Sequence, residues 1–161
     1  MIHIRDYEDK DWESICSIHD AARPDELRGS CDPMAFVPIQ KDAQVEELRR
    51  SKKFVAVDKA QVVGFVGVDG KYVAWLYVHP DYYHQGIGRR LLRKGLEAIG
   101  TGARTIVLDK NTSAIHLYAS EGFSEERRFE SDNAGYPVTC LVLSTEQRPK
   151  PDGKVEKSLG V

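Results

Sequence analysis

The chain has 161 residues, of which 41% are hydrophobic and 30% are charged, and its formal net charge is −2 at pH 7. This length suits a single domain with a substantial core, and the composition is that of an ordinary soluble protein. The slightly negative balance argues against nucleic acid as a partner, and no apolar run approaches the roughly 20 residues that cross a membrane.

The cysteines and histidines predict neither a disulfide framework nor a metal site. Cys16, Cys31 and Cys140 are scattered and form no C-x-x-C pair, and the five histidines show no metal-ligand spacing. Free thiols of this kind are typical of a reducing compartment. Because the first residues also lack an apolar signal region, we expect a cytoplasmic protein. We expect it to be a monomer or a homodimer.

The first half of the chain predicts three strands, a helix and a long connection. Residues 9–22 carry apolar side chains at helical spacing. Residues 21–52 form the connection, within which a short helix, residues 42–50, begins at a capping Asp42. The predicted strands are residues 2–5, 54–57 and 62–68, and the last two form an antiparallel pair.

The second half predicts strands and helices in alternation, followed by a polar tail. Asp69-Gly70 indicates a hairpin turn before the next strand. The predicted elements are strands at 71–78, 105–108, 129–132 and 141–143, and helices at 88–99 and 113–121. This order predicts an α+β fold with helices on both faces of a sheet. We expect one domain, residues 1–145, and a flexible tail, residues 146–161.

A glycine-rich loop before the helix at 88–99 predicts a phosphate site. The stretch from 75 to 92 reads WLYVHPDYYHQGIGRRLL, in which a strand leads through the loop into the helix. Gly86 and Gly88 have no side chains to obstruct a ligand, and the helix N-terminus adds partial positive charge. Arg89 lies in the first helical turn, beside the predicted phosphates. The loop therefore predicts a cofactor that carries a pyrophosphate.

Two common nucleotide motifs do not fit this loop. A dinucleotide-binding loop needs a third glycine where Leu91 stands, and no G-x-x-x-x-G-K-[ST] run occurs in the chain. The strand before the loop also follows a hairpin, so it does not open a parallel unit.

A second motif lies about 25 residues further on, in TIVLDKNTSAIHLYASEGF from 105 to 123. Its key positions are Asn111, Ala114, Tyr118, Gly122 and Phe123. Taken singly, these residues have ordinary structural explanations. Asn111 would cap the helix that follows it, and Tyr118 would be a core aromatic residue.

Taken together and in this order, the two segments resemble the GNAT superfamily of N-acetyltransferases. The phosphate loop of that family reads Arg/Gln-x-x-Gly-x-Gly/Ala after Val-x-Pro, and residues 83–88 align with it after Val78-His79-Pro80. Tyr83 departs from the pattern. The second segment matches Asn-x-x-Ala-x-x-x-Tyr-x-x-x-Gly-Phe at every position. The resemblance covers residues 1–145 and implies a layered fold with a mixed, mostly antiparallel sheet, and an N-acetyltransferase that uses acetyl-CoA.

The resemblance also implies which residues contact the cofactor. The strand end would pair with the pantetheine arm, a backbone N–H near its last residues would hold the oxyanion, and loop amides would bind the pyrophosphate. Asn111 would hydrogen-bond the pantetheine arm through its amide. Tyr118 would be the catalytic proton donor to the departing thiolate. The predicted cofactor-binding residues are Leu76, Tyr77, Val78, Gln85, Gly86, Ile87, Gly88, Arg89 and Asn111.

The sequence leaves the general base and the acceptor open. The candidates for the base are Asp69, His79, Asp109 and His116. The resemblance implies that residues 21–52 determine which acceptor amine the protein binds. There, Phe36, Val37 and Ile39 would either line a pocket or cap the core, and Asp25, Glu26 and Asp32 would either attract a cationic amine or be solvated.

Three functions are compatible with these features. The first is acetyl transfer to a primary amine of a small molecule, by direct attack in a ternary complex. The second is the same chemistry on a protein α-amine or lysine. The third is a module that binds coenzyme A without turnover.

Overall fold

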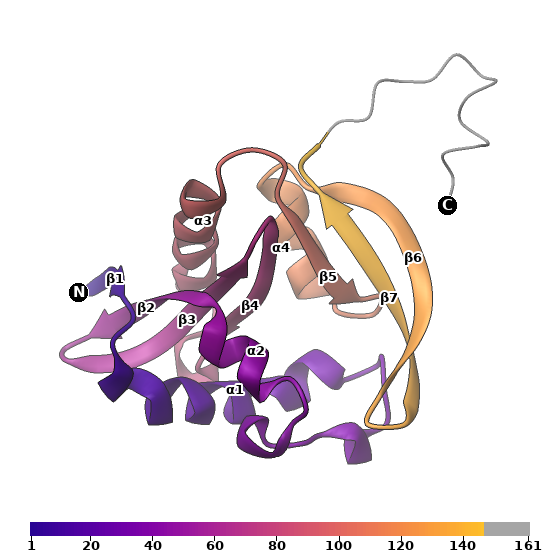
Figure 1. Cartoon of the computed structure of the whole chain (residues 1–161), viewed down its shortest axis with the longest axis horizontal. Helices are drawn as coiled ribbons and strands as arrows, with labels where there is room; N and C mark the ends of the chain where they lie inside the picture. The colour runs from indigo at the N-terminus through magenta and orange to yellow at the C-terminus, as the bar shows by residue number, and fades with distance from the viewer. Residues whose placement is uncertain (147–161) are drawn as a thin grey trace.

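The structure, a computed structural model, describes residues 1–146 and consists of one sheet with helices (Figure 1). The strands are β1 (Ile2–Asp6), β2 (Lys52–Asp58), β3 (Gln61–Asp69), β4 (Tyr72–Val78), β5 (Arg104–Leu108), β6 (Ser124–Asn133) and β7 (Tyr136–Ser144). The helices are α1 (Trp12–Leu27), α2 (Val45–Arg50), α3 (Ile87–Ile99) and α4 (Thr112–Ser120). The short 3₁₀ helices are η1 (Asp9–Asp11), η2 (Pro33–Ala35), η3 (Ile39–Lys41) and η4 (Pro80–Tyr82).

The seven strands lie in the order β1-β2-β3-β4-β5-β7-β6. Each neighbouring pair is antiparallel except β4 and β5, which are parallel. The predicted mixed, mostly antiparallel sheet with helices on both faces is therefore confirmed.

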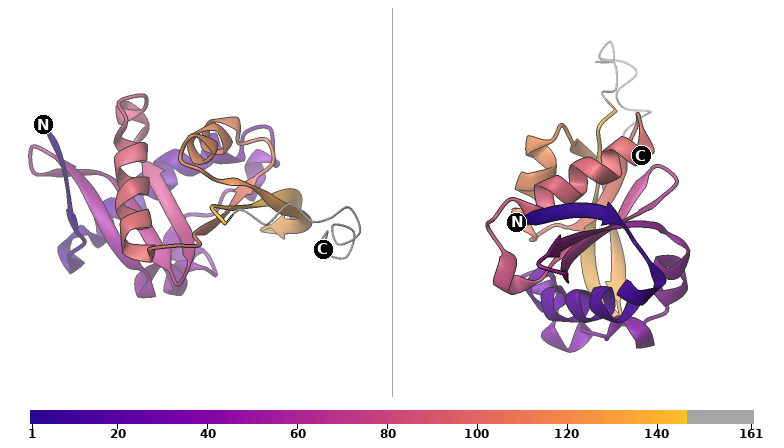
Figure 2. Two further views of the ribbon diagram at one scale, coloured as in Figure 1. Left: turned by 90° about the horizontal axis from the view of Figure 1, so that it is seen from above. Right: turned by 90° about the vertical axis from the view of Figure 1, so that its left-hand side faces the viewer.

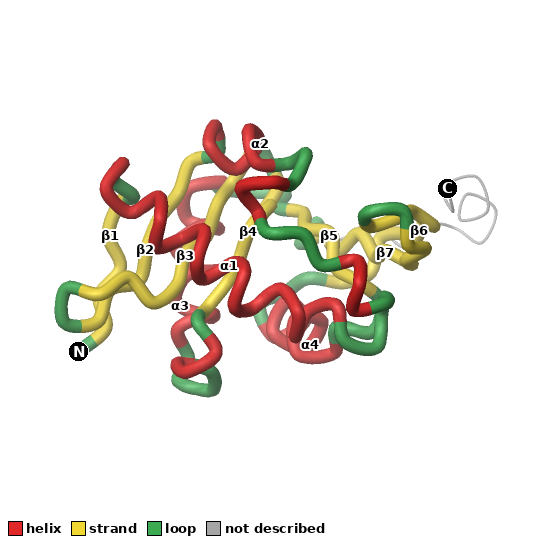
Figure 3. The backbone as a smooth tube through the Cα atoms, turned by 90° about the horizontal axis from the view of Figure 1, so that it is seen from below, coloured by secondary structure: helices red, strands yellow, loops and turns green. Residues whose placement is uncertain are grey.

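Helices cover both faces because the central strands are apolar on both sides. On β2, Phe54 and Ala56 belong to the core under α3, whereas Val55 and Val57 belong to the core against α1. In Figure 2, α3 and α4 lie side by side on one face of the sheet, and in Figure 3, α1 crosses the strands on the opposite face. The sheet is thus the middle of three layers.

The two central strands β4 and β5 diverge after a single paired position. Within residues 1–146, the ladder between them consists of Tyr72 and Arg104 alone. The next contact is made by a side chain, since the Thr105 hydroxyl donates to the carbonyl oxygen of Val73 at 2.8 Å. The register of β3 and β4 also shifts beside Ala74, and such a bulge increases the local twist. The second half of β4 is therefore paired with β3 but separated from β5.

Helix α1 differs from the helix predicted at residues 9–22. It begins at Trp12, after η1, and continues to Leu27 through Pro24. Leu27 is buried against Leu108, Val138 and Cys140, and this packing holds the last turns in place although proline removes a backbone donor. Residues 23–26, predicted to lie in a connection, are therefore helical.

Three other predicted boundaries change. Helix α2 begins after Gln44, and Asp42 accepts from the Gln44 N–H in the preceding turn rather than capping the helix. Strands β6 and β7 form a hairpin much longer than the predicted strands at 129–132 and 141–143. The predicted tail lies outside the described residues except for Glu146, which pairs with Arg104.

None of the helices in residues 1–146 is long and apolar enough to span a bilayer.

Lys53 is a buried cation that closes the end of α2. Its ammonium donates to the carbonyl oxygens of Leu48, Arg49 and Ser51, each at 2.9 Å, and lies 4.5 Å from the ring centroid of Tyr7. These oxygens lie at the C-terminal end of the helix, where carbonyls lack helical partners and a positive charge is favourable.

We expect Lys53→Met to lower the free energy of unfolding by about 1 to 3 kcal/mol, because methionine keeps the stem but leaves the carbonyl oxygens without their donor. Urea denaturation measures this change. The matched control is Lys52→Met on the same strand, because Lys52 is exposed and its loss should cost less than about 0.5 kcal/mol. Equal losses for the two variants would contradict the role given to Lys53.

Candidate active site

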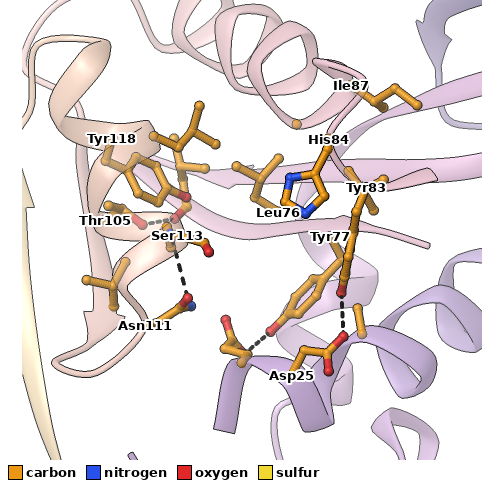
Figure 4. A pocket seen from close by; sticks show the side chains of 18 of the residues that line it. Asp25, Leu76, Tyr77, Tyr83, His84, Ile87, Thr105, Asn111, Ser113 and Tyr118 are labelled. Atoms are coloured by element: carbon orange, nitrogen blue, oxygen red, sulfur yellow. Dashed lines mark hydrogen bonds between the residues drawn. The ribbon is translucent and has the colours of Figure 1, made fainter. Parts of the chain in front are cut away.

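The divergence of β4 and β5 opens a cleft of about 570 Å³. Residues from both faces of the sheet line it. On the α3 and α4 side these are the glycine loop, Asn111, Ser113 and Tyr118, and on the α1 side they are Ala22, Asp25, Glu26 and Arg28. Figure 4 shows Tyr118, Thr105 and Asn111 on one wall and Tyr77 and Tyr83 on the other. The cleft therefore connects the two helical layers of the molecule.

The glycine loop presents unpaired backbone N–H groups to this cleft. Gly86 precedes α3 with φ of 77°, a left-handed conformation that glycine adopts without strain. The first helical hydrogen bond runs from Arg90 N–H to the Gly86 carbonyl oxygen. The N–H groups of Ile87, Gly88 and Arg89 precede that bond and have no partner within the helix. A Cβ at Gly86 would meet no atom within 4 Å, so the space beside the loop is open to a ligand.

Gln85 and Arg89, which the sequence predicts to bind the cofactor together with this loop, do not line the cleft through their side chains. Arg89 donates to Ser120 at 2.7 Å and to Glu121 at 3.0 Å, at the end of α4. Arg93 pairs with the same carboxylate, which holds the pKa of Glu121 below its usual range. Any part that Gln85 and Arg89 play at the loop therefore falls to their backbone amides.

Tyr118 lies at the cleft wall on α4. Its side chain is 4% exposed, and its ring packs edge-to-face on Phe123 with centroids 5.0 Å apart. Burial raises the pKa of the Tyr118 phenol to about 12, although a side-chain hydrogen bond with Thr105 opposes the rise. The phenol is therefore protonated at neutral pH and held at the point where the strands diverge.

Asn111 has the structural role that its sequence position also allowed. It is the N-cap residue of α4, and its side-chain oxygen accepts from the Ala114 N–H at 3.4 Å. This distance is long for such a bond, so the cap is weak. The side chain also lines the cleft, where its NH₂ group is a further donor.

On the opposite wall, two carboxylates of α1 accept hydrogen bonds from two tyrosines. Tyr83 donates to Asp25 at 3.1 Å, and Tyr77 donates to Glu26 at 2.7 Å. The hydrogen bond to Asp25 and burial raise the pKa of Tyr83 to about 12, with burial the larger cause. Tyr83 is the residue that departs from the family's loop pattern.

Other residues named from the sequence lie elsewhere. The four candidates for the general base are absent from the cleft lining. Ile39 is fully buried in the core against α1, and Phe36 packs in the cluster around Leu27. Ile39 and Phe36 therefore cap the core, and neither they nor Val37 is among the residues that line the cleft. Sequence reasoning missed His84 and Ser113 in the lining, because both occupy variable positions within the two motifs.

Comparisons with known proteins agree with this geometry. A family model described as an acetyltransferase (GNAT) domain matches residues 49–125. The chain is similar to the peptidyl-lysine N-acetyltransferase YjaB of Salmonella typhimurium, with 35% identity over 107 residues that cover 63% of this chain and 73% of that one.

Solved structures share the fold. One is a GCN5-related N-acetyltransferase from Rhodopseudomonas palustris, with a TM-score of 0.78, 18% identity and coverage of 90% of this chain and 95% of that one. Another is the PaiA N-acetyltransferase of Thermoplasma acidophilum in complex with coenzyme A, with a TM-score of 0.68, 16% identity and coverage of 91% and 99%.

The chain belongs to the GNAT superfamily of N-acetyltransferases. The resemblance drawn from the two sequence motifs is thereby confirmed, and the protein is an acetyltransferase whose co-substrate is acetyl-CoA.

The two roles of Asn111 can be separated with a pair of variants. Asn111→Asp keeps a capping oxygen and removes the NH₂ donor, whereas Asn111→Ala removes both. We expect the Asp variant to keep its melting temperature but to bind coenzyme A about tenfold more weakly, since one hydrogen bond is worth about 1 kcal/mol. Calorimetric titration and thermal unfolding measure the two effects. Full affinity in the Asp variant would leave Asn111 as a helix cap only.

Proposed function

We propose that the enzyme transfers the acetyl group of acetyl-CoA to a primary amine of a small molecule, by direct attack in a ternary complex. The observation that carries this proposal is the cleft between β4 and β5. On one face of the sheet it has free backbone N–H groups, which suit a phosphate, and on the other face it has carboxylates. A cleft of this kind can hold a thioester and an amine together, and such placement supplies much of the rate of an acyl transfer.

The residues of the cleft fit acetyl-CoA. The N–H groups at the start of α3 would hold its pyrophosphate, and the unpaired edge of β4 at Leu76, Tyr77 and Val78 would pair with the pantetheine arm. The cofactor supplies an activated acetyl group as a thioester. A backbone N–H near Tyr77 or Val78 would stabilise the oxyanion.

Tyr118 would provide the proton that the leaving thiolate needs. Its pKa of about 12 leaves the phenol protonated at neutral pH, and Tyr118 lines the cleft. A protonated phenol at this wall could act as the general acid. Its presence favours turnover over a module that only binds coenzyme A.

A second acceptor class is the side chain of lysine in proteins. It is favoured by the similarity to YjaB, whose name describes a peptidyl-lysine N-acetyltransferase. Both acceptor classes present a primary ammonium on an alkyl chain. A screen of free amines and lysine peptides with acetyl-CoA, read by thiol release, tests the proposal and separates the two. Absence of thiol release with every amine would overturn it.

We expect Gly86→Val to abolish the rise in melting temperature that acetyl-CoA gives the parent protein, because the new side chain would fill the space beside the loop. The control is Gly100→Val at the other end of α3, where φ is also positive, at 85°, and no atom lies within 4 Å. That variant should be destabilised but should keep the ligand-induced rise. An unchanged rise in the Gly86 variant would contradict the loop assignment.

We expect Tyr118→Phe to reduce kcat by roughly 10²- to 10⁴-fold, because it keeps the packed ring and removes the proton donor. The affinity for coenzyme A and the melting temperature should change little. Tyr82→Phe is the control, since Tyr82 also lines the cleft but bonds Asp58 at 3.3 Å. A kcat for Tyr118→Phe within twofold of the parent would remove Tyr118 from the chemistry.

A further inference from the structure

We propose that Glu26 is the residue that binds the acceptor ammonium, and that Tyr77 positions it for this role. The inference rests on the acetyl-transfer function proposed above and adds a preference of the site for cationic amines. It follows from which oxygen atoms of the two α1 carboxylates, Asp25 and Glu26, already accept hydrogen bonds.

The position of Glu26 gives an acceptor access to it. It lies on the last turns of α1, where it lines the cleft from the face opposite to the glycine loop and Tyr118. Its side chain is 26% exposed, so an incoming group can reach the carboxylate, although much of it is shielded from water. An amine that enters from the α1 side would meet Glu26 before it reaches the point where β4 and β5 diverge.

The hydrogen bonds of Glu26 fix its orientation and leave one oxygen available. Tyr77 and Arg23 both donate to Oε1, and neither donates to Oε2. The Tyr77 ring is held in turn by His19, at a centroid distance of 5.0 Å, and by Phe65, at 5.7 Å. A carboxylate held by one oxygen presents the other to a ligand with little loss of conformational entropy on binding.

The neighbouring Asp25 has both oxygens engaged and is the weaker candidate. Arg28 donates to its Oδ1 at 2.9 Å, and Tyr83 donates to its Oδ2 at 3.1 Å. The bond to Tyr83 joins α1 to the loop that precedes α3. Tyr83, which departs from the family pattern, thus braces the helix that carries Glu26.

An ammonium group matches the free oxygen of Glu26. A charge-assisted hydrogen bond in a partly shielded site is roughly twice as strong as a neutral one. Removal of the negative charge of Glu26 should therefore weaken the binding of cationic acceptors by roughly 10- to 100-fold. It should leave the binding of uncharged amines nearly unaffected. This difference distinguishes recognition of an ammonium from a general loss of structure.

The test compares the parent and Glu26→Gln with two probes. One is N-α-acetyl-lysine amide, which carries a single ammonium. The other is its alkoxyamine counterpart, in which oxygen replaces the methylene beside the amine, so that the nitrogen is uncharged at neutral pH. We expect KM for the cationic probe to rise roughly 10- to 100-fold in the variant and KM for the alkoxyamine to change less than about twofold. The affinity for coenzyme A, measured by calorimetry without acceptor, should be unchanged.

Two further variants control for indirect effects. Glu46→Gln removes a carboxylate from another i,i+3 pair, with Arg49 on α2, which lies away from the cleft, and should leave KM for both probes unchanged. Tyr77→Phe keeps the ring on His19 and Phe65 but frees the Glu26 carboxylate. It should raise KM for the cationic probe by roughly 3- to 10-fold with little change in kcat.

Several results would overturn the inference. These are an equal loss with both probes, a matching loss of coenzyme A affinity, an unchanged KM in Glu26→Gln, and a parent enzyme that acetylates only anionic or zwitterionic amines. A parent enzyme that releases no thiol with any amine would instead overturn the proposed function on which the inference rests. The two failures are therefore distinguishable.

Discussion

The site depends on the single paired position between β4 and β5. Two parallel strands at the centre of a sheet would normally pair along their length, and their backbone groups would then be satisfied by each other. Here Tyr72 and Arg104 begin the pairing, the Thr105 hydroxyl bonds Val73, and the strands then separate. The unpaired edge that results is stable only where water or a ligand supplies hydrogen bonds. Cores on both faces of the sheet hold the two strands at this angle.

Charge is distributed unequally across this opening. On the α3 side, Arg89 and Arg93 are occupied by Glu121, so the attraction for an anion comes from backbone N–H groups and the helix dipole. On the α1 side, Asp25 and Glu26 are held by phenols and by arginines within α1 and at its C-terminal end. Backbone donors would suit a pyrophosphate because they cannot rotate away from it. Carboxylates held by hydrogen bonds would likewise suit the cationic amine proposed above.

The sequence predicted those parts of the fold and the site that depend on local backbone requirements. Gly86 needs a positive φ, and Asn111 caps a helix, and both requirements show in the residue types themselves. The continuation of α1 through Pro24 could not be predicted, because it depends on the burial of Leu27 against strands far along the chain. The length of strand β6 was underestimated because the strand is rich in charged side chains, which are typical of an exposed edge and leave no alternation of apolar residues to read. The partner of Tyr83 lies 58 residues away, so no local pattern could reveal it.

The cleft is lined from both faces of the sheet, and this arrangement bears on the order of events in catalysis. A site with one mouth forces the second substrate to wait behind the first and traps the first product behind the second. With the nucleotide on the side of α3 and α4, an amine that arrived past α1 would not have to pass it. Steric access would then impose no compulsory sequence of binding, and the acetylated amine could depart while coenzyme A was still in place.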